Sequence, residues 1–196
     1  GGMITTSDKH LAEKMRVLSL HGISKDAWKR YTSEGSWFYE IIYPGYKYNM
    51  SDIEASIGIH QLKKLDSMQK KRKEIARIYS ESFENIPQIF TPIVKEYAEH
   101  AWHLYPILLN INLLSISRNE FIEALKAENI GTSVHFIPIH LHPYYRDNYE
   151  YKLGDFPIAE SIYDREISLP IYPKMTEEDV QCVINAVKKI ISCYRK

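Results

Sequence analysis

The chain has 196 residues, enough for one domain, or roughly one and a half, with a substantial buried core. Its 25 lysine and arginine residues balance 25 aspartate and glutamate residues, so no overall field attracts a polyanion and nucleic acid is not the expected partner. Apolar runs are short and the N-terminus lacks the order of a signal peptide, so we expect a soluble protein that is neither membrane-bound nor exported. Cys182 and Cys193 lie about three turns apart on one predicted helix, too far to bridge within it, and indicate a reducing, cytoplasmic setting.

The first predicted elements are a short strand and a helix. Residues 1–6 read as a strand entered from a glycine turn, and the helix that follows has Ser7 as a candidate N-cap and Gly22 as its C-cap. A single strand cannot satisfy its own hydrogen-bond ladder, so we expect the chain to be a piece of a longer protein. Residues 23–43 are rich in aromatic side chains and predict an ordered functional loop or a flap that packs on a partner.

The most informative segment is the loop at residues 44–55, which leads into a capped helix. Ser51 and Glu54 form a capping box that sets the helix start. Lys47 and Asn49 come just before it, where a cation, an amide and the helix N-terminus favour a phosphate or a carboxylate. Most tyrosine-rich turns before helices only pack, so on local physics alone packing is the commoner interpretation.

Two helices are predicted next, over residues 52–65 and 67–83. The apolar positions expected to face inward are Ile53, Ile57 and Leu62 on the first, and Ile75, Ile78 and Tyr79 on the second. The basic run at residues 70–73 is followed by Glu74 and has no interleaved aromatic residue. It therefore predicts a solvated helix face rather than a nucleic-acid patch.

Beyond residue 86 the pattern alternates between strand and helix. Strands are expected at residues 103–109 and 132–137, with a short extended piece at 169–171, and helices after Ser117, over 156–167, and from Thr176 to about Cys193. Pro106 restricts the first strand to an edge or an irregular place in the sheet. The pattern predicts an α+β fold in which a few-stranded sheet carries helices on one face.

Histidines supply the candidate chemistry of this region. His135 lies in a predicted strand, and His140 and His142 follow in a proline-rich loop. Alternate residues of an extended segment point the same way, so His140 and His142 could bind a metal, but no third ligand has metal spacing and we expect none. Imidazoles with tyrosine hydroxyls also suit a polar, hydroxylated or phosphorylated small molecule. The sequence has neither a glycine-rich phosphate loop nor a nucleophile elbow.

Several motifs together resemble those of the DegT-type nucleotide-sugar aminotransferases, along nearly the whole chain. They are GYKYNMSDIEA at 45–55, AWHLY at 101–105, GTSVHF at 131–136 and LPIYPKMT at 169–176. Within that family, the Pro-Gly-aromatic-Lys-Tyr-Asn form of the loop is most similar to the members that make UDP-4-amino-4-deoxy-arabinose.

The resemblance implies fold type I of the pyridoxal phosphate enzymes, with the present chain as the C-terminal small domain and the last strand-helix segment of the large domain. It implies transfer of an amino group, usually from glutamate, to a keto nucleotide sugar, in a site between two subunits of a homodimer. Lys47 and Asn49 would then reach the neighbour's cofactor phosphate. His135, His140 and Tyr48 match the substrate-binding side, near the sugar or its phosphates. The resemblance also implies three parts of the chain. Residues 1–50 would be the tail of the large domain with the loop that reaches the neighbouring subunit, residues 51–85 the connecting helices, and residues 86–196 the C-terminal α+β small domain.

One departure from the family limits this expectation. Residues 1–6 are similar to the strand just downstream of the cofactor lysine, and no lysine of the chain lies in a Ser-Phe-His-x-x-Lys context. We therefore assign no catalytic residue, and we expect the chain alone to lack transaminase activity and not to retain pyridoxal phosphate. The alternatives are a non-catalytic module that dimerises or binds a nucleotide sugar, and a nucleotide-binding domain unrelated to transamination.

Overall fold

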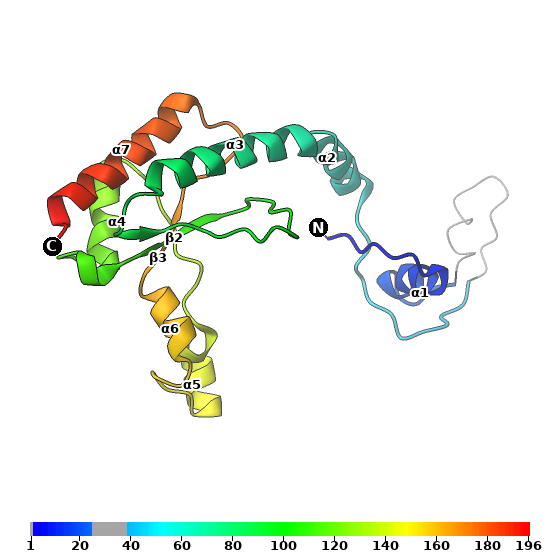
Figure 1. Cartoon of the computed structure of the whole chain (residues 1–196). Coiled ribbons are helices and arrows are strands. Elements are labelled where there is room, and N and C mark those ends of the chain that lie inside the picture. The colour runs from blue at the N-terminus through cyan, green and yellow to red at the C-terminus, as the bar shows by residue number, and fades with distance from the viewer. Residues whose placement is uncertain (1, 25–38) are drawn as a thin grey trace. The chain divides into compact units, whose positions relative to one another are not determined.

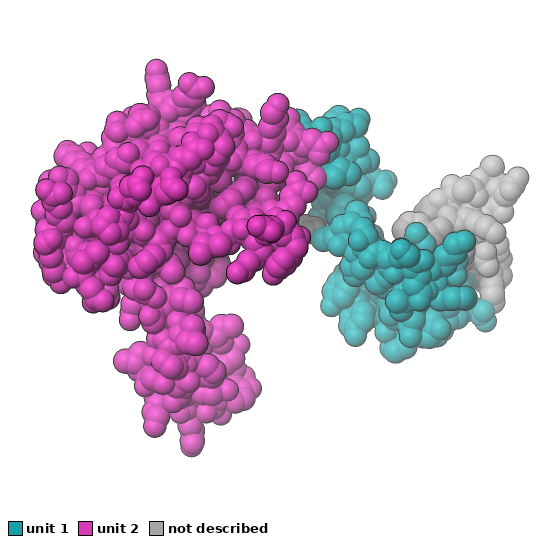
Figure 2. Space-filling view, in the orientation of Figure 1, with its two compact units in different colours: residues 1–64 teal, residues 65–196 magenta. Residues whose placement is uncertain are grey.

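The computed structural model describes residues 2–24 and 39–196 (Figure 1). Internal contacts divide the chain into two compact units, residues 1–64 and 65–196 (Figure 2). Most of the predicted flap at residues 23–43 lies outside the described residues. The three-part division at residues 50 and 85 stays a prediction beside this two-unit organisation.

The first unit begins with helix α1, Lys9–Ser19. Asp8 caps it by accepting the backbone N–H groups of His10 and Leu11, so the cap lies one residue after the predicted Ser7. The strand predicted over residues 1–6 is wrong for the described residues 2–6, which are exposed and pair with no described strand. Gly22 follows the end of α1 with a φ of 71°, and its N–H returns to the Val17 carbonyl.

Two glycines let the chain cross itself closely beyond α1. A Cβ on Gly22 would overlap the carbonyl of Tyr43, and a Cβ on Gly45 would overlap the backbone of Gly22. Only residues without side chains allow this approach. The crossing brings Tyr46 and Tyr48 to the end of α1, where their N–H groups donate to the carbonyls of residues 18 and 19.

Helix α2, Asp52–Leu62, begins at the predicted capping box of Ser51 and Glu54. The expectation that Ile53, Ile57 and Leu62 face inward is wrong in this structure, where they are 75%, 58% and 69% exposed. Among the described residues of the first unit, no second layer covers that face. The buried hydrophobic residues of the described chain all belong to the second unit.

The second unit is a three-stranded antiparallel sheet with helices packed on it (Figure 1). In chain order its elements are α3 (Leu65–Phe83), β1 (Ile89–Phe90), β2 (Tyr105–Leu109), η2 (Ile111–Leu113), α4 (Arg118–Ala127), η3 (Ile139–Leu141), α5 (Pro143–Tyr149), α6 (Pro157–Tyr163), β3 (Glu166–Leu169) and α7 (Glu177–Tyr194). The strand order is β1-β2-β3. Helices α3 and α4 both pack against α7, and α4 also contacts β3. Figure 1 shows α5 and α6 projecting away from α3 and α7.

The core lies between the sheet and these helices. Tyr105, Ile107 and Leu109 alternate along β2 and are fully buried, as the period of a strand requires. Tyr79 of α3 packs on Tyr105 with ring centroids 5.1 Å apart, and its hydroxyl donates to the Pro170 carbonyl at 2.9 Å. Burial raises the pKa of Tyr105 to about 12. The predicted inward positions of α3 are therefore confirmed for Ile75 and Tyr79, whereas Ile78 is only partly buried.

Pro106 lies in the central strand, in unbroken register with β3, at a point that β1 does not reach, so β2 is locally an edge there. The N–H of Leu109 donates to the Arg165 carbonyl, so alternate nitrogens of β2 face β3 and the nitrogen of Pro106 faces the other side. Strand β1 pairs only with Leu108 and Leu109 and does not reach Pro106. The missing N–H therefore leaves no partner in β1 unsatisfied.

Two predicted elements of the C-terminal region are corrected. Residues 132–137 form no strand, and their one pairing is an isolated bridge between Ser133 and Ser168. The helix expected over 156–167 ends at Tyr163, and residues 166–169 form β3, since their side chains are buried in the sheet layer. The helices capped by Ser117 and Thr176 are confirmed, each with a complete capping box. Within the described residues, no helix is both long and apolar enough to cross a membrane.

Candidate functional site

The Lys47–Asn49 loop presents hydrogen-bond donors to solvent. The ammonium group of Lys47 donates to the side-chain oxygen of Asn49. The remaining ammonium hydrogens and the amide NH₂ are donors, and the Asn49 oxygen, the one side-chain acceptor atom of the pair, is already engaged by the ammonium group. Both residues are exposed. A set of donors with one positive charge fits a phosphate group.

The N-terminus of α2 adds less to this site than its position suggests. The Glu54 carboxylate accepts the N–H and the hydroxyl of Ser51, each at 2.8 Å, and Ser51 accepts the N–H of Glu54. The backbone N–H and then the hydroxyl of Ser51 lower the pKa of Glu54 and favour its charged form. Asp52 brings a second acid into the same turn. These charges oppose an incoming anion, so the attraction comes from Lys47 and Asn49.

Tyr48 lies between these two residues. Its ring stacks on Tyr46 with centroids 5.0 Å apart and an interplanar angle of 3°. Its side chain is nevertheless 74% exposed. The backbone of the loop is held at the end of α1 by an isolated bridge between Leu20 and Lys47. The loop thus offers an aromatic ring beside the cation and the amide.

His135 belongs to the second unit and is held by residues of β3. Its Nδ1 lies 2.8 Å from the Ser168 hydroxyl, which in turn lies 2.6 Å from the Glu166 carboxylate. The other oxygen of Glu166 accepts the backbone N–H of His135 at 2.9 Å. Glu166 and Ser168 are each 4% exposed, whereas the histidine is half-buried. The imidazole is therefore anchored on one edge by two buried polar side chains.

His140 is held by a different carboxylate. Its Nε2 lies 2.7 Å from Glu160, and both residues are buried. Glu160 also accepts the backbone N–H groups of Gly154 and Phe156. Burial alone would raise the pKa of Glu160, but the hydrogen bonds from His140, Phe156 and Gly154 together lower it. The acid is therefore a charged anchor that fixes both the histidine and the segment before α6.

An aromatic cavity of about 430 Å³ adjoins His140. Its lining residues are Pro138, Ile139, His140, Tyr145, Tyr149, Tyr151, Phe156 and Ala159. The His140 ring lies 4.7 Å from that of Phe156 between centroids. His135 and His140 are thus in the same unit but belong to separate hydrogen-bond systems. Lys47, Asn49 and Tyr48 belong to the other unit.

The geometry of the histidine loop also bears on metal binding. Residues 139–141 form the 3₁₀ helix η3, so the extended segment assumed for His140 and His142 is wrong. The Nε2 of His140 is already engaged by Glu160. Over residues 2–24 and 39–196, no group of three or more His, Cys, Asp or Glu side chains could hold a metal ion.

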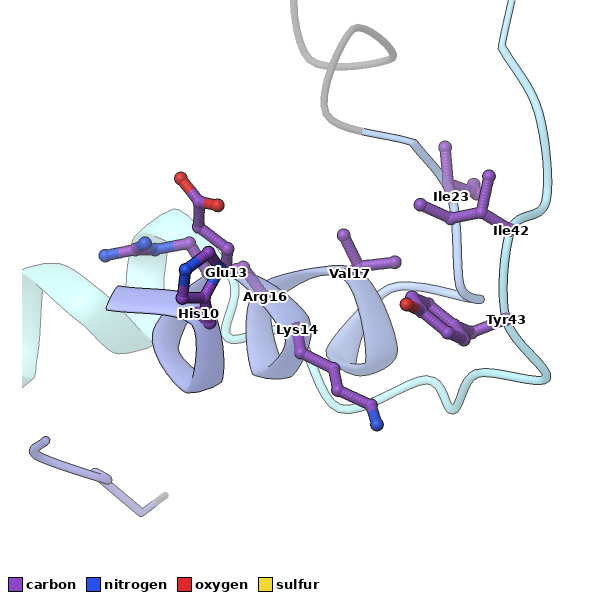
Figure 3. Close-up of a pocket in the computed structure, with 8 residues that line it drawn as sticks. All are labelled: His10, Glu13, Lys14, Arg16, Val17, Ile23, Ile42 and Tyr43. Carbon is purple, nitrogen blue, oxygen red and sulfur yellow. The ribbon is translucent and has the colours of Figure 1, made fainter. Parts of the chain in front are cut away.

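A second cavity, of about 410 Å³, lies against α1 in the first unit (Figure 3). Val17, Ile23 and Ile42 give it an apolar wall. Figure 3 shows the charged ends of Lys14 and Arg16 pointing away from each other. Lys14 lies over the Tyr43 ring, 5.5 Å from its centroid. The charges do not converge on one point, so this cavity does not define an ion site.

Sequence reasoning missed the three residues that anchor the histidines: Glu160, Glu166 and Ser168. Glu166 and Ser168 lie in the short segment EISL, all four residues of which are buried. The alternation of Glu166 and Ser168 with Ile167 and Leu169 was the available signal, because buried acids need partners. Glu160 gave a weaker signal, because acids are common in the first turn of a helix.

Comparison with known proteins agrees with this fold. The sequence model of the DegT/DnrJ/EryC1/StrS aminotransferase family matches residues 1–188. An uncharacterized protein of Methanocaldococcus jannaschii is 66% identical over 192 residues, 98% of this chain and 50% of that protein. The spore coat polysaccharide biosynthesis protein SpsC of Bacillus subtilis is 55% identical over 192 residues, 97% of this chain and 49% of its own length.

Solved structures give the same result. A Streptococcus pneumoniae protein described as a sugar aminotransferase, Spr1654, matches in its PMP form with a TM-score of 0.81 and 32% identity, covering 96% of this chain and 46% of its own. It also matches in its PLP form, so the family uses pyridoxal phosphate. The predicted fold class, part of a fold type I aminotransferase, is confirmed.

These findings identify the class first: the fold is that of a pyridoxal-phosphate aminotransferase. The chain belongs to the DegT/DnrJ/EryC1/StrS family of sugar aminotransferases. It spans about half the length of the curated relatives that it matches.

Proposed function

We propose that this chain forms part of an aminotransferase that moves an amino group from glutamate to a keto nucleotide sugar. The observation that carries the proposal is the set of hydrogen-bond donors that Lys47 and Asn49 present to solvent. They lie on a loop whose sequence resembles the corresponding motif of the family that the chain matches. The name of the Bacillus subtilis relative supports a product destined for a polysaccharide. The form of the loop supports a product of the UDP-4-amino-4-deoxy-arabinose type.

Each site residue has a binding role in this proposal. Lys47 and Asn49 donate to the phosphate of the cofactor held by the neighbouring subunit, and Tyr48 borders the substrate beside them. His135 and His140 face the sugar or its phosphates, His140 through the part of its ring that Glu160 leaves available. When bound, the cofactor supplies the electron sink for the amino transfer. The chain's own residues bind and orient; we propose no proton-transferring residue among them.

The neighbouring subunit implies a homodimer, which we propose as the working assembly. The free, exposed thiols of Cys182 and Cys193 suit a cytoplasmic enzyme. We further propose that the 196 residues alone neither retain the cofactor nor transaminate, because none of their lysines has the Schiff-base context. That same feature favours the second candidate, a non-catalytic module that dimerises or binds a nucleotide sugar.

The test compares Lys47→Ala with Lys63→Ala, a second exposed lysine close by in the sequence. Both changes are made in the full-length protein, meaning a polypeptide of the relatives' length that contains this chain. Loss of one charge-assisted hydrogen bond, about 1.5–3 kcal/mol, predicts a cofactor Kd roughly ten- to a hundredfold weaker for Lys47→Ala and unchanged for Lys63→Ala. Equal affinity in both variants would remove Lys47 from the site.

A second measurement separates the two candidates. The 196-residue chain is mixed with pyridoxal phosphate, reduced with borohydride, and its intact mass determined. The proposal predicts no specific reduced adduct on any lysine and no visible band of lysine-bound cofactor. A stoichiometric adduct on one lysine would contradict the proposed inactivity. In the full-length protein, the absence of both adduct and amino transfer would favour the non-catalytic module.

A further inference from the structure

A hydrogen-bond network connects His135 to the side chains of Ser168 and Glu166. The Ser168 hydroxyl lies between the Nδ1 of His135, at 2.8 Å, and one oxygen of Glu166, at 2.6 Å. The second oxygen of Glu166 accepts the backbone N–H of His135 at 2.9 Å. Glu166 and Ser168 are 96% removed from solvent, at 4% exposure each. Such a network persists in a fold only when donors and acceptors match.

Counting hydrogens in this network sets the form of the imidazole. A carboxylate only accepts, so the single hydroxyl hydrogen of Ser168 points to Glu166. The Ser168 oxygen can then only accept from His135, and Nδ1 must carry a hydrogen. In the neutral ring the other nitrogen, Nε2, is therefore an acceptor. No described residue bonds to that Nε2.

We propose that Glu166 and Ser168 are positioning residues that hold His135 as the Nδ1–H tautomer, so that Nε2 accepts a hydrogen bond from a hydroxyl of the sugar. A lone pair on Nε2 accepts from a hydroxyl and repels the oxygens of a phosphate, which are acceptors too. The network thereby assigns His135 to the sugar rather than to the phosphates. The contact between Nε2 and a sugar hydroxyl, the ligand half of this proposal, rests on the proposed function, whereas the tautomer of His135 does not.

His140 provides an internal contrast. Its Nε2 lies 2.7 Å from the Glu160 carboxylate and must carry the hydrogen, because the carboxylate cannot donate. Direct contact with a carboxylate thus puts the hydrogen on Nε2 of His140, while contact through a serine puts it on Nδ1 of His135. The two histidines should display opposite tautomers in one spectrum of the same protein.

The experiment is a long-range ¹H–¹⁵N correlation spectrum of the chain with ¹⁵N-labelled histidine, recorded at alkaline pH. His135→Gln identifies the signal of His135. The wild type should show protonated Nδ1 and unprotonated Nε2 for His135, with the reverse for His140. A predominantly Nε2–H form of His135 in the wild type would overturn the proposal.

Two variants test the cause. In Glu166→Gln the amide oxygen accepts the backbone N–H of His135, and the amide NH₂ donates to the Ser168 oxygen. The Ser168 hydroxyl then donates to the Nδ1 of His135. The tautomer should therefore reverse, with little change in the shape of the side chain at position 166. Ser168→Ala should give a mixture of tautomers. Ser133→Ala, whose exposed side chain lies in the neighbouring bridge, should leave the tautomer unchanged and is the matched control. An unchanged tautomer in Glu166→Gln, with the other histidine signals in place, would overturn the positioning role.

The ligand half is tested in the full-length protein with UDP-glucose and UDP as probes. Glu166→Gln should weaken UDP-glucose binding roughly tenfold, because a donor then faces the hydroxyl hydrogen, and should leave UDP binding unchanged. Equal weakening of both probes would assign His135 to the phosphates and overturn this half. Failure of the wild type to bind UDP-glucose would overturn the sugar assignment for this probe and count against the proposed function, while the tautomer result would stand.

Discussion

The two units of the chain differ in whether they bury apolar side chains in a core of their own. The second unit encloses a core of aromatic and aliphatic residues between a sheet and three helices. In the first unit neither α1 nor α2 contains a buried residue. The first unit is nonetheless organised, by two glycines and a few backbone hydrogen bonds that fix the loop of Lys47. The loop of Lys47 is thus shaped by local contacts with the end of α1.

The anchored histidines of the second unit follow the opposite rule. His135 depends on Glu166 and Ser168, and His140 depends on Glu160, all of them buried. Their positions therefore depend on the stability of the sheet and of α6. The comparison predicts that core changes in the second unit disturb the histidines, whereas changes in the first unit disturb the loop alone.

The largest effect is expected from Phe121→Ala in the core of the second unit. Phe121 is fully buried, and its truncation should lower the free energy of unfolding by about 3–5 kcal/mol. Urea denaturation followed by circular dichroism gives the measurement. A loss below about 1 kcal/mol would mean that the site collapses around the smaller side chain and that the core is less tightly packed than described.

The next effect is local to the first unit. Gly45→Ala places a Cβ in the backbone of Gly22, so the loop of Lys47 must move away from α1. Amide hydrogen exchange at Tyr46 and Tyr48 should become at least about tenfold faster, because their bonds to α1 are lost.

Gly58→Ala is the matched control for that change. A Cβ on Gly58 meets no atom within 4 Å, and the residue lies in the interior of α2. Alanine there should favour the helix by up to about 1 kcal/mol and leave the loop amides unchanged. Equal exchange rates in Gly45→Ala and Gly58→Ala would show that the glycine crossing does not position the loop.

A smaller effect is expected at the start of α4. Ser117 accepts the N–H of Glu120 in a complete capping box, and Ser117→Ala should cost about 1 kcal/mol of unfolding free energy. Ser161→Ala, at an exposed position of α6, should change stability by less than about 0.5 kcal/mol. The difference between the urea midpoints of the two variants measures how much the Ser117 cap stabilises the chain. Equal midpoints would mean that packing alone stabilises α4.

Acid should weaken the second unit through the same caps. The backbone N–H and the hydroxyl of Ser117 lower the pKa of Glu120 below its ordinary value of 4.5, and Thr176 acts in the same way on Asp179. The folded state thus binds fewer protons than the unfolded state, so this stabilisation is complete above that value and is lost as pH falls through the lowered pKa. Urea midpoints should fall on acidification below pH 4.5, and less steeply in Glu120→Gln. An unchanged pH profile in Glu120→Gln would exclude the cap as the cause.

The smallest effect is expected on the exposed face of α2. Ile57 is 58% exposed, so Ile57→Ser should change the stability of the chain by no more than about 0.5 kcal/mol. The same urea titration measures it. A loss of unfolding free energy comparable to that of Phe121→Ala would show that α2 is packed within the chain. The two units would then not differ in burial as proposed.

The features that the sequence predicted correctly are mostly local ones. Ser51 and Glu54, and Ser117 and Glu120, form capping boxes within three residues of each other, so their spacing alone predicts the helix starts. The donor character of Lys47 and Asn49 follows from their residue types. The burial of α2 was mispredicted because an apolar helix face predicts that a partner layer exists, not that the layer lies in the same chain.

The features that were missed depend on contacts between distant residues. Ser168 lies 33 residues after His135 and Glu160 lies 20 after His140, and no periodicity connects them. The register of β2 and β3 decides that Glu166 and Ser168 reach the histidine segment, and register is set by the pairing of whole strands. Pro106 lies where β2 is locally an edge, one of the two predicted possibilities, but the short β1 that leaves this edge open gave no sequence signal.

The most direct test of the central claim, that this chain contributes Lys47 and Asn49 to a cofactor site of a neighbouring subunit, is complementation between two variants of the full-length protein. One variant carries Lys47→Ala with Asn49→Ala, and the other lacks the Schiff-base lysine. Each alone should be inactive, and mixed dimers should regain amino transfer because one of their two sites is intact. Mixed dimers that form but stay as inactive as either parent would contradict the account.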